Sequence, residues 1–190
     1  MSNLIEIQPS IPVLFDKALK PLQDYLESNL PWLNTAYGKA YRQVRSVNER
    51  QYFYPAVHDA KTEHLNMEPD GLLGNYSWFD VSDPLEVINM DNSGSFDLKA
   101  NVGLILSFDI RNVNPNWKDM TISNVQQEVI VKLIEFGNVL LELGKQMEVQ
   151  ERSENIFSGY SYKQLDQNYL MRPYGCFRIN FDVIAKTSLC

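Results

Sequence analysis

Both histidines of the chain lie in one short segment, residues 57–64, which reads VHDAKTEH. Asp59 and Glu63 stand between His58 and His64, so imidazole and carboxylate groups occur here together. These side chains are zinc ligands, and a zinc site takes three or four ligands at bond lengths of about 2 Å. The segment is therefore the first candidate for chemistry.

The spacing of the two histidines argues against a metal site. A helix would turn His64 by about 240° from the face of His58, and an extended strand would separate them by about 20 Å. Only a turn between them brings the rings together, and the usual histidine pairs are spaced i, i+4 or lie in short loops. We therefore predict a polar connection at the end of a strand, with no metal and no cofactor. A small metal-binding or hydrolytic domain using His58, Asp59 and His64 is the alternative.

Other catalytic patterns are missing from the sequence. It contains no G-x-S-x-G, no G-x-x-x-x-G-K-[ST] and no G-x-G-x-x-G, so neither a serine nucleophile nor a phosphate loop is indicated. Cys176 falls inside an alternating strand pattern, where a buried thiol is expected, and Cys190 has no neighbour that would activate it. We predict that the protein is not an enzyme.

Composition indicates a folded, acidic protein. The 190 residues are 44% hydrophobic and 12% aromatic, which suits one domain spanning residues 1–190. The net charge of −7 argues against a protein that wraps nucleic acid. Two cysteines suit a reducing compartment. The first ten residues lack the pattern of a signal peptide, and no apolar run approaches the roughly 20 residues that span a bilayer. We expect a cytoplasmic product with no membrane partner.

Charge is distributed unevenly along the chain. Residues 39–50 hold four basic residues and one acidic residue, a balance of +3, whereas residues 59–97 hold nine acidic residues and one lysine, a balance of −8. Such patches either meet within one subunit or pair head-to-tail between subunits, which closes a ring when the rotation allows. The resulting interface candidates are Lys39, Arg42, Arg45, Arg50, Asp59, Glu63, Asp70, Trp78, Asp80 and Asp83.

Hydrophobic periodicity predicts two helices. The first follows Ser10 as its cap and ends near Pro31, with a kink or break at Pro21. The second carries a capping box of Ser123 and Gln126 and ends at Gly144. Its apolar stripe is wide enough to be buried against a sheet; it comprises Val125, Val129, Ile130, Leu133, Ile134, Phe136, Leu140 and Leu141.

Alternating apolar residues predict the strands. A hairpin over residues 39–57 turns near Asn48, and further strands cover residues 75–81, 98–110 and 176–186, with a polar strand at 145–153. A turn around Gly94 precedes the strand at 98–110. Residues 55–101 are acidic and rich in turns but carry scattered apolar side chains, so we predict an extended arm that docks on its own core or on a partner. The fold class is α+β: an antiparallel sheet with an N-terminal helix and one long helix packed on a face, plus this arm.

The order of these elements resembles tail-completion or tail-terminator proteins of tailed bacteriophages and the related neck-ring proteins of head–tail connectors. The matching pieces are PVLFDKALKPLQDYLESNL, YRQVRSVNERQYFYPAV, NVGLILSFDI, NVQQEVIVKLIEFGNVL and FRINFDVIAK. The phrase YFYPAV, followed by EPDGLLGNYSWFDVSDP, is similar to such proteins from phages of Bacteroidetes, including crAss-like phages.

The resemblance implies a structural virion protein without catalytic residues. It would form a ring of six or twelve copies in the phage neck, between portal-side connector proteins and the tail, after assembly in the host cytoplasm. DNA would pass through the lumen without sequence-specific binding, and a net acidic chain suits this because it repels phosphate. A monomeric adaptor that docks its acidic arm on a basic partner is a further alternative.

Overall fold

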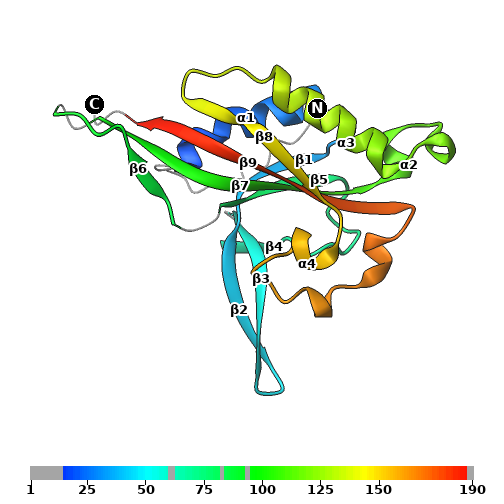
Figure 1. Cartoon of the computed structure of the whole chain (residues 1–190). Coiled ribbons are helices and arrows are strands. Elements are labelled where there is room, and N and C mark those ends of the chain that lie inside the picture. Colours follow the sequence, from blue (N-terminus) through cyan, green and yellow to red (C-terminus); the bar gives the residue numbers. More distant parts are fainter. Residues whose placement is uncertain (1–14, 60–62, 82–83, 93–94, 188–190) are drawn as a thin grey trace.

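The computed structural model describes residues 15–59, 63–81, 84–92 and 95–187. The chain forms two sheets, two longer helices and several short helical turns (Figure 1). The helices are α1 (Phe15–Asn29), α2 (Ile110–Val113), α3 (Ile122–Glu135) and α4 (Ser153–Ile156), with 3-10 turns η1 (Trp117–Asp119), η2 (Tyr162–Gln164) and η3 (Gln167–Leu170). The strands are β1 (Thr35–Lys39), β2 (Tyr41–Val47), β3 (Arg50–Asp59), β4 (Glu63–Asn66), β5 (Tyr76–Val81), β6 (Glu86–Ile88), β7 (Phe96–Asp109), β8 (Leu141–Gln150) and β9 (Tyr174–Thr187).

The larger sheet has the order β1-β5-β7-β9-β8, and β6 pairs with the beginning of β7. Its pairs are antiparallel except for β1 and β5, which run parallel. The smaller sheet is antiparallel, with the order β2-β3-β4. The predicted α+β class is confirmed, with an N-terminal helix and one further long helix on a face of a mainly antiparallel sheet.

Helices α1 and α3 cover one face of the larger sheet (Figure 1). Apolar side chains recur on one side of each helix, Leu19, Leu22 and Leu26 on α1 and Val129 and Leu133 on α3, and all of them are buried. They pack on the apolar side chains that β7 and β9 direct to this face. The burial of such a face, rather than helix propensity, is what holds helices of this length in place.

Helix α1 runs through Pro21 without the predicted break. A proline inside a helix removes one hydrogen bond and crowds the preceding turn, at a cost of about 3 kcal/mol. Burial of Leu19, Leu22 and Leu26 on both sides of the proline outweighs that cost. The predicted cap at Ser10 lies outside the described residues, as does the turn at Gly94.

Helix α3 differs from the prediction at both ends. The capping box is formed by Thr121 and Asn124, not by Ser123 and Gln126. The helix ends at Glu135 and does not reach Gly144, because residues from Leu141 onward pair with β9 as strand β8.

The predicted stripe of α3 is also too wide. Ile134 is 70% exposed and Leu140 is exposed in the loop after the helix, so neither packs against the sheet. The buried apolar residues of the helix are Val125, Val129 and Leu133, and Gln126 is buried beside them.

A second core lies on the opposite face of the larger sheet. Tyr76, Trp78 and Ile105 of the sheet pack there against Val57 of β3 and Phe157 after α4. The segment before β9 therefore serves as a cover for this face. Cys176 is buried in the same core, as its strand pattern predicted.

Residues 55–101 do not form an extended arm. They contribute the end of β3, then β4, β5 and β6, and the beginning of β7. Strand β5 lies inside the larger sheet between β1 and β7, and both Trp78 and Phe79 are fully buried. The hairpin of β2 and β3 projects from the body on the side opposite to α1 and α3 (Figure 1). Among the described residues, the helices are all too short or too polar to cross a membrane.

Candidate functional site

The β2–β3 hairpin is exposed around its turn and buried only near its base. Its register pairs Val47 with Arg50, which leaves Asn48 and Glu49 as a two-residue turn. Both turn residues have positive φ, 49° and 64°, as a type I′ hairpin turn requires. The sequence correctly placed this turn. Side chains from position 44 to position 51 are exposed on both faces of the hairpin, including Val44 at 49% and Val47 at 45%.

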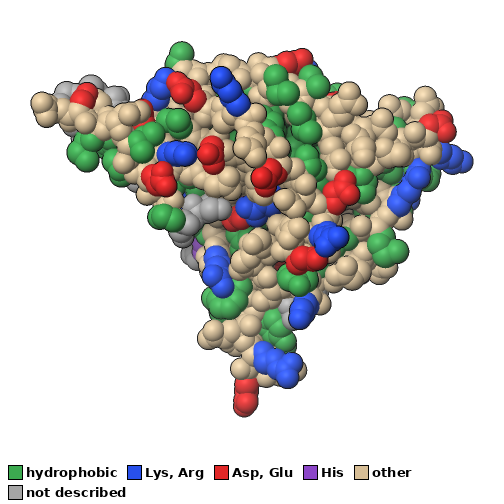
Figure 2. Space-filling model, in the orientation of Figure 1, with side chains coloured by type: hydrophobic (Ala, Val, Ile, Leu, Met, Phe, Trp, Pro, Cys, Tyr) green, Lys and Arg blue, Asp and Glu red, His purple; other side chains and the backbone are tan. Residues whose placement is uncertain are grey.

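Basic side chains follow this hairpin, with one acidic side chain at its tip (Figure 2). The Arg42 guanidinium lies 3.9 Å from the centre of the Phe53 ring, and that of Arg45 lies 5.4 Å from the Tyr54 ring. Arginine over an aromatic face is attracted by the ring quadrupole. Arg50 forms no ion pair with any residue that the structure describes.

One basic residue of the hairpin is paired within the subunit. Arg45 lies 3.2 Å from a carboxylate oxygen of Glu68, just beyond β4. The basic and acidic segments of the sequence thus do meet within one chain at this point. Arg42 and Arg50 are the basic hairpin residues that the described residues leave without an ionic partner.

The base of the hairpin is attached to the loop before β9. The amide of Ser161 donates to the carbonyl oxygen of Phe53 at 2.8 Å, and the amide of Phe53 donates to Oγ of Ser161 at 3.0 Å. Closer to the sheet, Pro55, Ala56 and Val57 are buried. The base of the hairpin, next to the sheet, is therefore fixed, and the exposed half with the turn extends from it.

Tyr41 ties the start of β2 to helix α1. Its hydroxyl donates a 2.9 Å hydrogen bond to Oδ2 of Asp16. Burial of the Tyr41 hydroxyl, together with this hydrogen bond and the Asp16 charge, raises its pKa from 10.0 to about 12. Burial raises the pKa of Tyr76 and Tyr160 as well.

We expect these tyrosines to make the fold sensitive to base. The pKa of Tyr41 is higher in the folded than in the unfolded chain. The contribution of its hydroxyl to the free energy of unfolding is therefore complete below pH 10 and is lost as the pH rises from 10 to about 12. Urea unfolding across this range should show a falling midpoint. The Tyr41→Phe variant should show a smaller fall, since Tyr76 and Tyr160 remain; an unchanged fall would contradict the assignment to Tyr41.

Behind the hairpin, a buried ion pair crosses the larger sheet. Arg178 on β9 is only 4% exposed, and its Nη1 lies 2.6 Å from Oδ2 of Asp80 on β5. Its Nε donates to Oδ1 of Asn180 at 2.5 Å, and the Tyr160 hydroxyl donates to Oδ1 of Asp80 at 3.0 Å. Gly103 on β7 lies directly beneath the guanidinium. The cluster links β5, β7 and β9 to the covering loop.

This cluster corrects two of the predicted interface residues. Asp80 is engaged with Arg178 and Tyr160, and Trp78 is fully buried beside the Tyr160 ring, 6.0 Å between centroids. Trp78 is therefore not available at the surface of the subunit, and the Asp80 side chain is only 17% exposed and already paired. Alternation in residues 176–186 indicates that Arg178 lies on the polar side of the strand. That side is buried at Arg178 only because the segment before β9 covers it.

The two histidines do come together, because β3 and β4 form a hairpin. His58 pairs directly with His64, with 6.5 Å between the ring centroids and an angle of 84° between the rings. Asp59 and Glu63 are the next pair of the same register. Within the described residues, however, no group of three or more histidine, cysteine, aspartate or glutamate side chains is arranged to hold a metal ion. The side chains of Asp59 and Glu63, the other candidate ligands, lie outside the described part of the structure.

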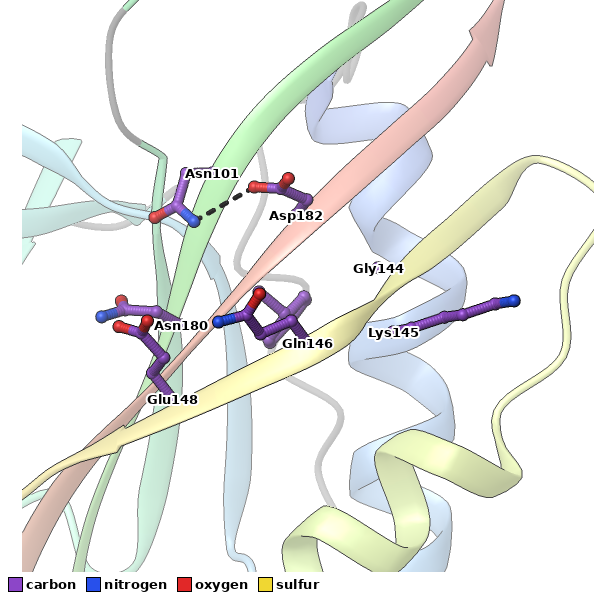
Figure 3. Close-up of a pocket in the computed structure, with 8 residues that line it drawn as sticks. Asn101, Gly144, Lys145, Gln146, Glu148, Asn180 and Asp182 are labelled. Atoms are coloured by element: carbon purple, nitrogen blue, oxygen red, sulfur yellow. Dashed lines mark hydrogen bonds between the residues drawn. The ribbon is translucent and has the colours of Figure 1, made fainter.

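A polar hollow of about 450 Å³ lies on the outer part of the larger sheet, over β7, β9 and β8 (Figure 3). Leu143 pairs with Val183 and Met147 with Phe181, so β8 advances four residues while β9 advances two. This bulge ends regular pairing and opens the hollow. The lining comprises Asn101, Gly144, Lys145, Gln146, Glu148, Asn180, Phe181 and Asp182.

The bulge requires a close approach at Gly144. A Cβ atom at this position would lie 3.1 Å from both Cβ and the carbonyl oxygen of Asp182, which is tighter than ordinary packing. The sequence suggested this glycine as a helix stop. The structure shows that it lets β8 fold onto β9 beside the hollow.

The hollow has an acidic character. Asp182 accepts a 3.3 Å hydrogen bond from Asn101 and lies 3.6 Å from Nζ of Lys99. Glu148 has no hydrogen bond or ion pair with any described residue. Lys145, the only basic residue of the lining, points away from the other side chains (Figure 3).

The remaining candidates are dispersed. Lys39 is half-buried at the end of β1, and its ammonium lies 5.4 Å from the Tyr41 ring. Asp70 is exposed and accepts a hydrogen bond from the Leu72 amide, so it serves a local turn. Asp59 and Glu63 are placed as strand positions only, and Asp83 lies outside the described residues. The basic candidates thus lie on or beside the hairpin, whereas Asp70 and Asp80, the acidic candidates whose side chains the structure describes, serve separate local contacts.

Comparison of the sequence with models of protein families gives no match. Comparison with curated proteins gives no significant match either.

Proposed function

We propose that this protein is a structural component of a tailed-phage neck or tail terminator, which assembles as a ring through its β2–β3 hairpin. The observation that carries this proposal is the hairpin itself. It projects beyond the body of the subunit, and its side chains are exposed on both faces from position 44 to position 51 (Figure 1). A two-stranded hairpin alone is marginally stable in water, so a projecting one with exposed valines suits burial against another subunit.

The position of the hairpin favours a ring over a closed dimer. The hairpin projects on the side of the sheet opposite to the helices and makes up one surface of the subunit (Figure 1). Its binding partner on a neighbour is then a different surface. Repeated contacts between unlike surfaces form a ring when the rotation between subunits closes. Such a ring would join the portal-side connector to the tail and let DNA pass.

The charge of the chain suits a DNA channel better than DNA binding. The net charge is −7, and a lumen of like sign repels the phosphate backbone. Catalysis has less support from the side chains. The thiol of Cys176 is buried and its pKa is raised by that burial, so it is a poor nucleophile at neutral pH.

We expect self-association that weakens with salt and depends on Arg50. Sedimentation velocity at about 0.05 M and about 0.5 M salt should show larger species at the lower concentration, because screening shortens the range of exposed charges. Negative-stain images of the larger species should show rings. The Arg50→Glu variant should weaken association by about tenfold or more.

Lys118→Glu is the matched control. Lys118 is exposed in η1, at the other end of the molecule, and its reversal changes the net charge by the same amount. It should associate like the wild type. Wild-type chains that remain monomeric at every concentration and both salt levels would contradict the proposal, as would equal effects of the two reversals.

A further inference from the structure

We propose that the β2–β3 hairpin of one copy docks edge-on in the polar hollow of β7, β8 and β9 of a second copy, so that Arg42 and Arg50, which lie on opposite faces of the hairpin, reach Glu148 and Asp182 from its two sides. This inference rests on the proposed function and names the surface that receives the hairpin. The acidic segment of residues 59–97, which the sequence offered for that role, has two of its carboxylates already paired within the subunit, Asp80 with Arg178 and Glu68 with Arg45.

The receiving surface is the uncovered part of the larger sheet. Asp182, Asn180 and Arg178 alternate along β9 on the side opposite to the helices. The loop before β9 covers Arg178, through its contact with the Ile156 carbonyl oxygen, but leaves Asp182 about half-exposed. The hollow therefore begins where the second core ends.

Charge complementarity selects a second copy of this chain as the occupant. Glu148 lacks a partner among the described residues, and Asp182 has a single lysine at 3.6 Å. The hairpin brings two guanidinium groups that have no ionic partner there either, Arg42 and Arg50. Guanidinium groups bind carboxylates through directed, often paired hydrogen bonds.

The amides of the hollow add a second kind of complementarity. Asn101, Gln146 and Asn180 carry both donors and acceptors into the lining. Strand β2 pairs only with β3, so its outer edge presents backbone N–H and C=O groups. Side-chain amides can form hydrogen bonds with the backbone groups of this edge without adding a strand to the sheet. Pairing of strand edges into a continuous sheet across many copies is thereby avoided.

The hairpin cannot fill the hollow of its own subunit. It is directed away from the sheet (Figure 1), whereas the hollow lies against the sheet surface (Figure 3). The contact is therefore made between copies, and each copy offers one hairpin and one hollow. This is a head-to-tail arrangement.

Two charge-neutralised variants test this pairing. The hairpin variant carries Arg42→Gln and Arg50→Gln, and the hollow variant carries Glu148→Gln and Asp182→Asn. Each variant alone should associate about tenfold or more weakly than the wild type. An equal mixture should form pairs of twice 22.0 kDa and nothing larger, because only one intact hairpin and one intact hollow can meet in each pair.

The controls distinguish three outcomes: a variant that does not fold, a hairpin that does not bind the hollow, and a chain that does not self-associate. All four side chains lie at the surface, so circular dichroism and thermal midpoints should match the wild type. A Lys118→Gln, Asp119→Asn variant should associate normally. If the wild type and the hollow variant associate equally, or if the mixture forms species larger than pairs, this inference is wrong while the ring proposal stands. If the wild type never associates, the proposed function fails first.

Discussion

Replacement of Gly103 by alanine is expected to lower the free energy of unfolding by about 3–5 kcal/mol, the cost of breaking a buried ion pair. A Cβ atom at this position would overlap Nε and Cζ of Arg178 and lie 2.6 Å from Nη2. The guanidinium cannot move aside while it keeps its 2.6 Å contact with Asp80 and its hydrogen bond to Asn180. Its displacement would leave the Asp80 carboxylate half-enclosed without its cation.

Gly137→Ala is the control for the loss of a glycine. A Cβ atom there meets nothing within 4 Å. Its effect should remain within about 1 kcal/mol, because only the entropy of the unfolded chain changes. Urea unfolding of both variants measures the difference. Similar stabilities of the Gly103→Ala and Gly137→Ala proteins would show that the guanidinium is free to move.

Trp78→Ala should cost about 3–5 kcal/mol, as for other large aromatic side chains removed from a core. Trp78 is fully buried and packs edge-on against Tyr160. The same core holds Val57, at the base of the hairpin. We therefore expect the hairpin base to loosen as well as the whole fold to lose stability.

Hydrogen exchange can separate these two effects. The Met67 amide donates to the carbonyl oxygen of Pro55 at 2.9 Å and reports on the hairpin base. Its exchange should accelerate more in Trp78→Ala than that of amides in the β7–β9 ladder. Leu72→Ala, at a residue that is 88% exposed, is the control and should change neither stability nor exchange. Equal acceleration at all amides would contradict the local role of Trp78.

The two predictions concern the support of the hairpin rather than its exposed half. Both variants should therefore also weaken self-association, whereas the surface variants at Arg42 and Arg50 should weaken it without loss of stability. This difference distinguishes residues that hold the hairpin in place from residues that contact a neighbour.

Local patterns in the sequence predicted most elements of the fold. Alternation placed the strands now seen as β5, β7 and β9, and the pair Asn48 and Glu49 lies where a hairpin turn was expected. These predictions hold because side-chain direction repeats every two residues in a strand and about every 3.6 in a helix. The same patterns cannot say where a helix gives way to a strand when apolar residues continue, and so the end of α3 was misplaced.

Tertiary structure decided everything that depends on partners distant in sequence. Asp80 and Arg178 are 98 residues apart, and no local pattern in the sequence links them. Whether the polar side of a strand faces water depends on which layer covers it. Counts of acidic residues likewise suggested one surface in residues 59–97. The fold instead pairs Asp80 with Arg178 and Glu68 with Arg45, and the acidic side chains of the hollow are Glu148 and Asp182. Charge acts through distance and burial, and only the packed chain determines both.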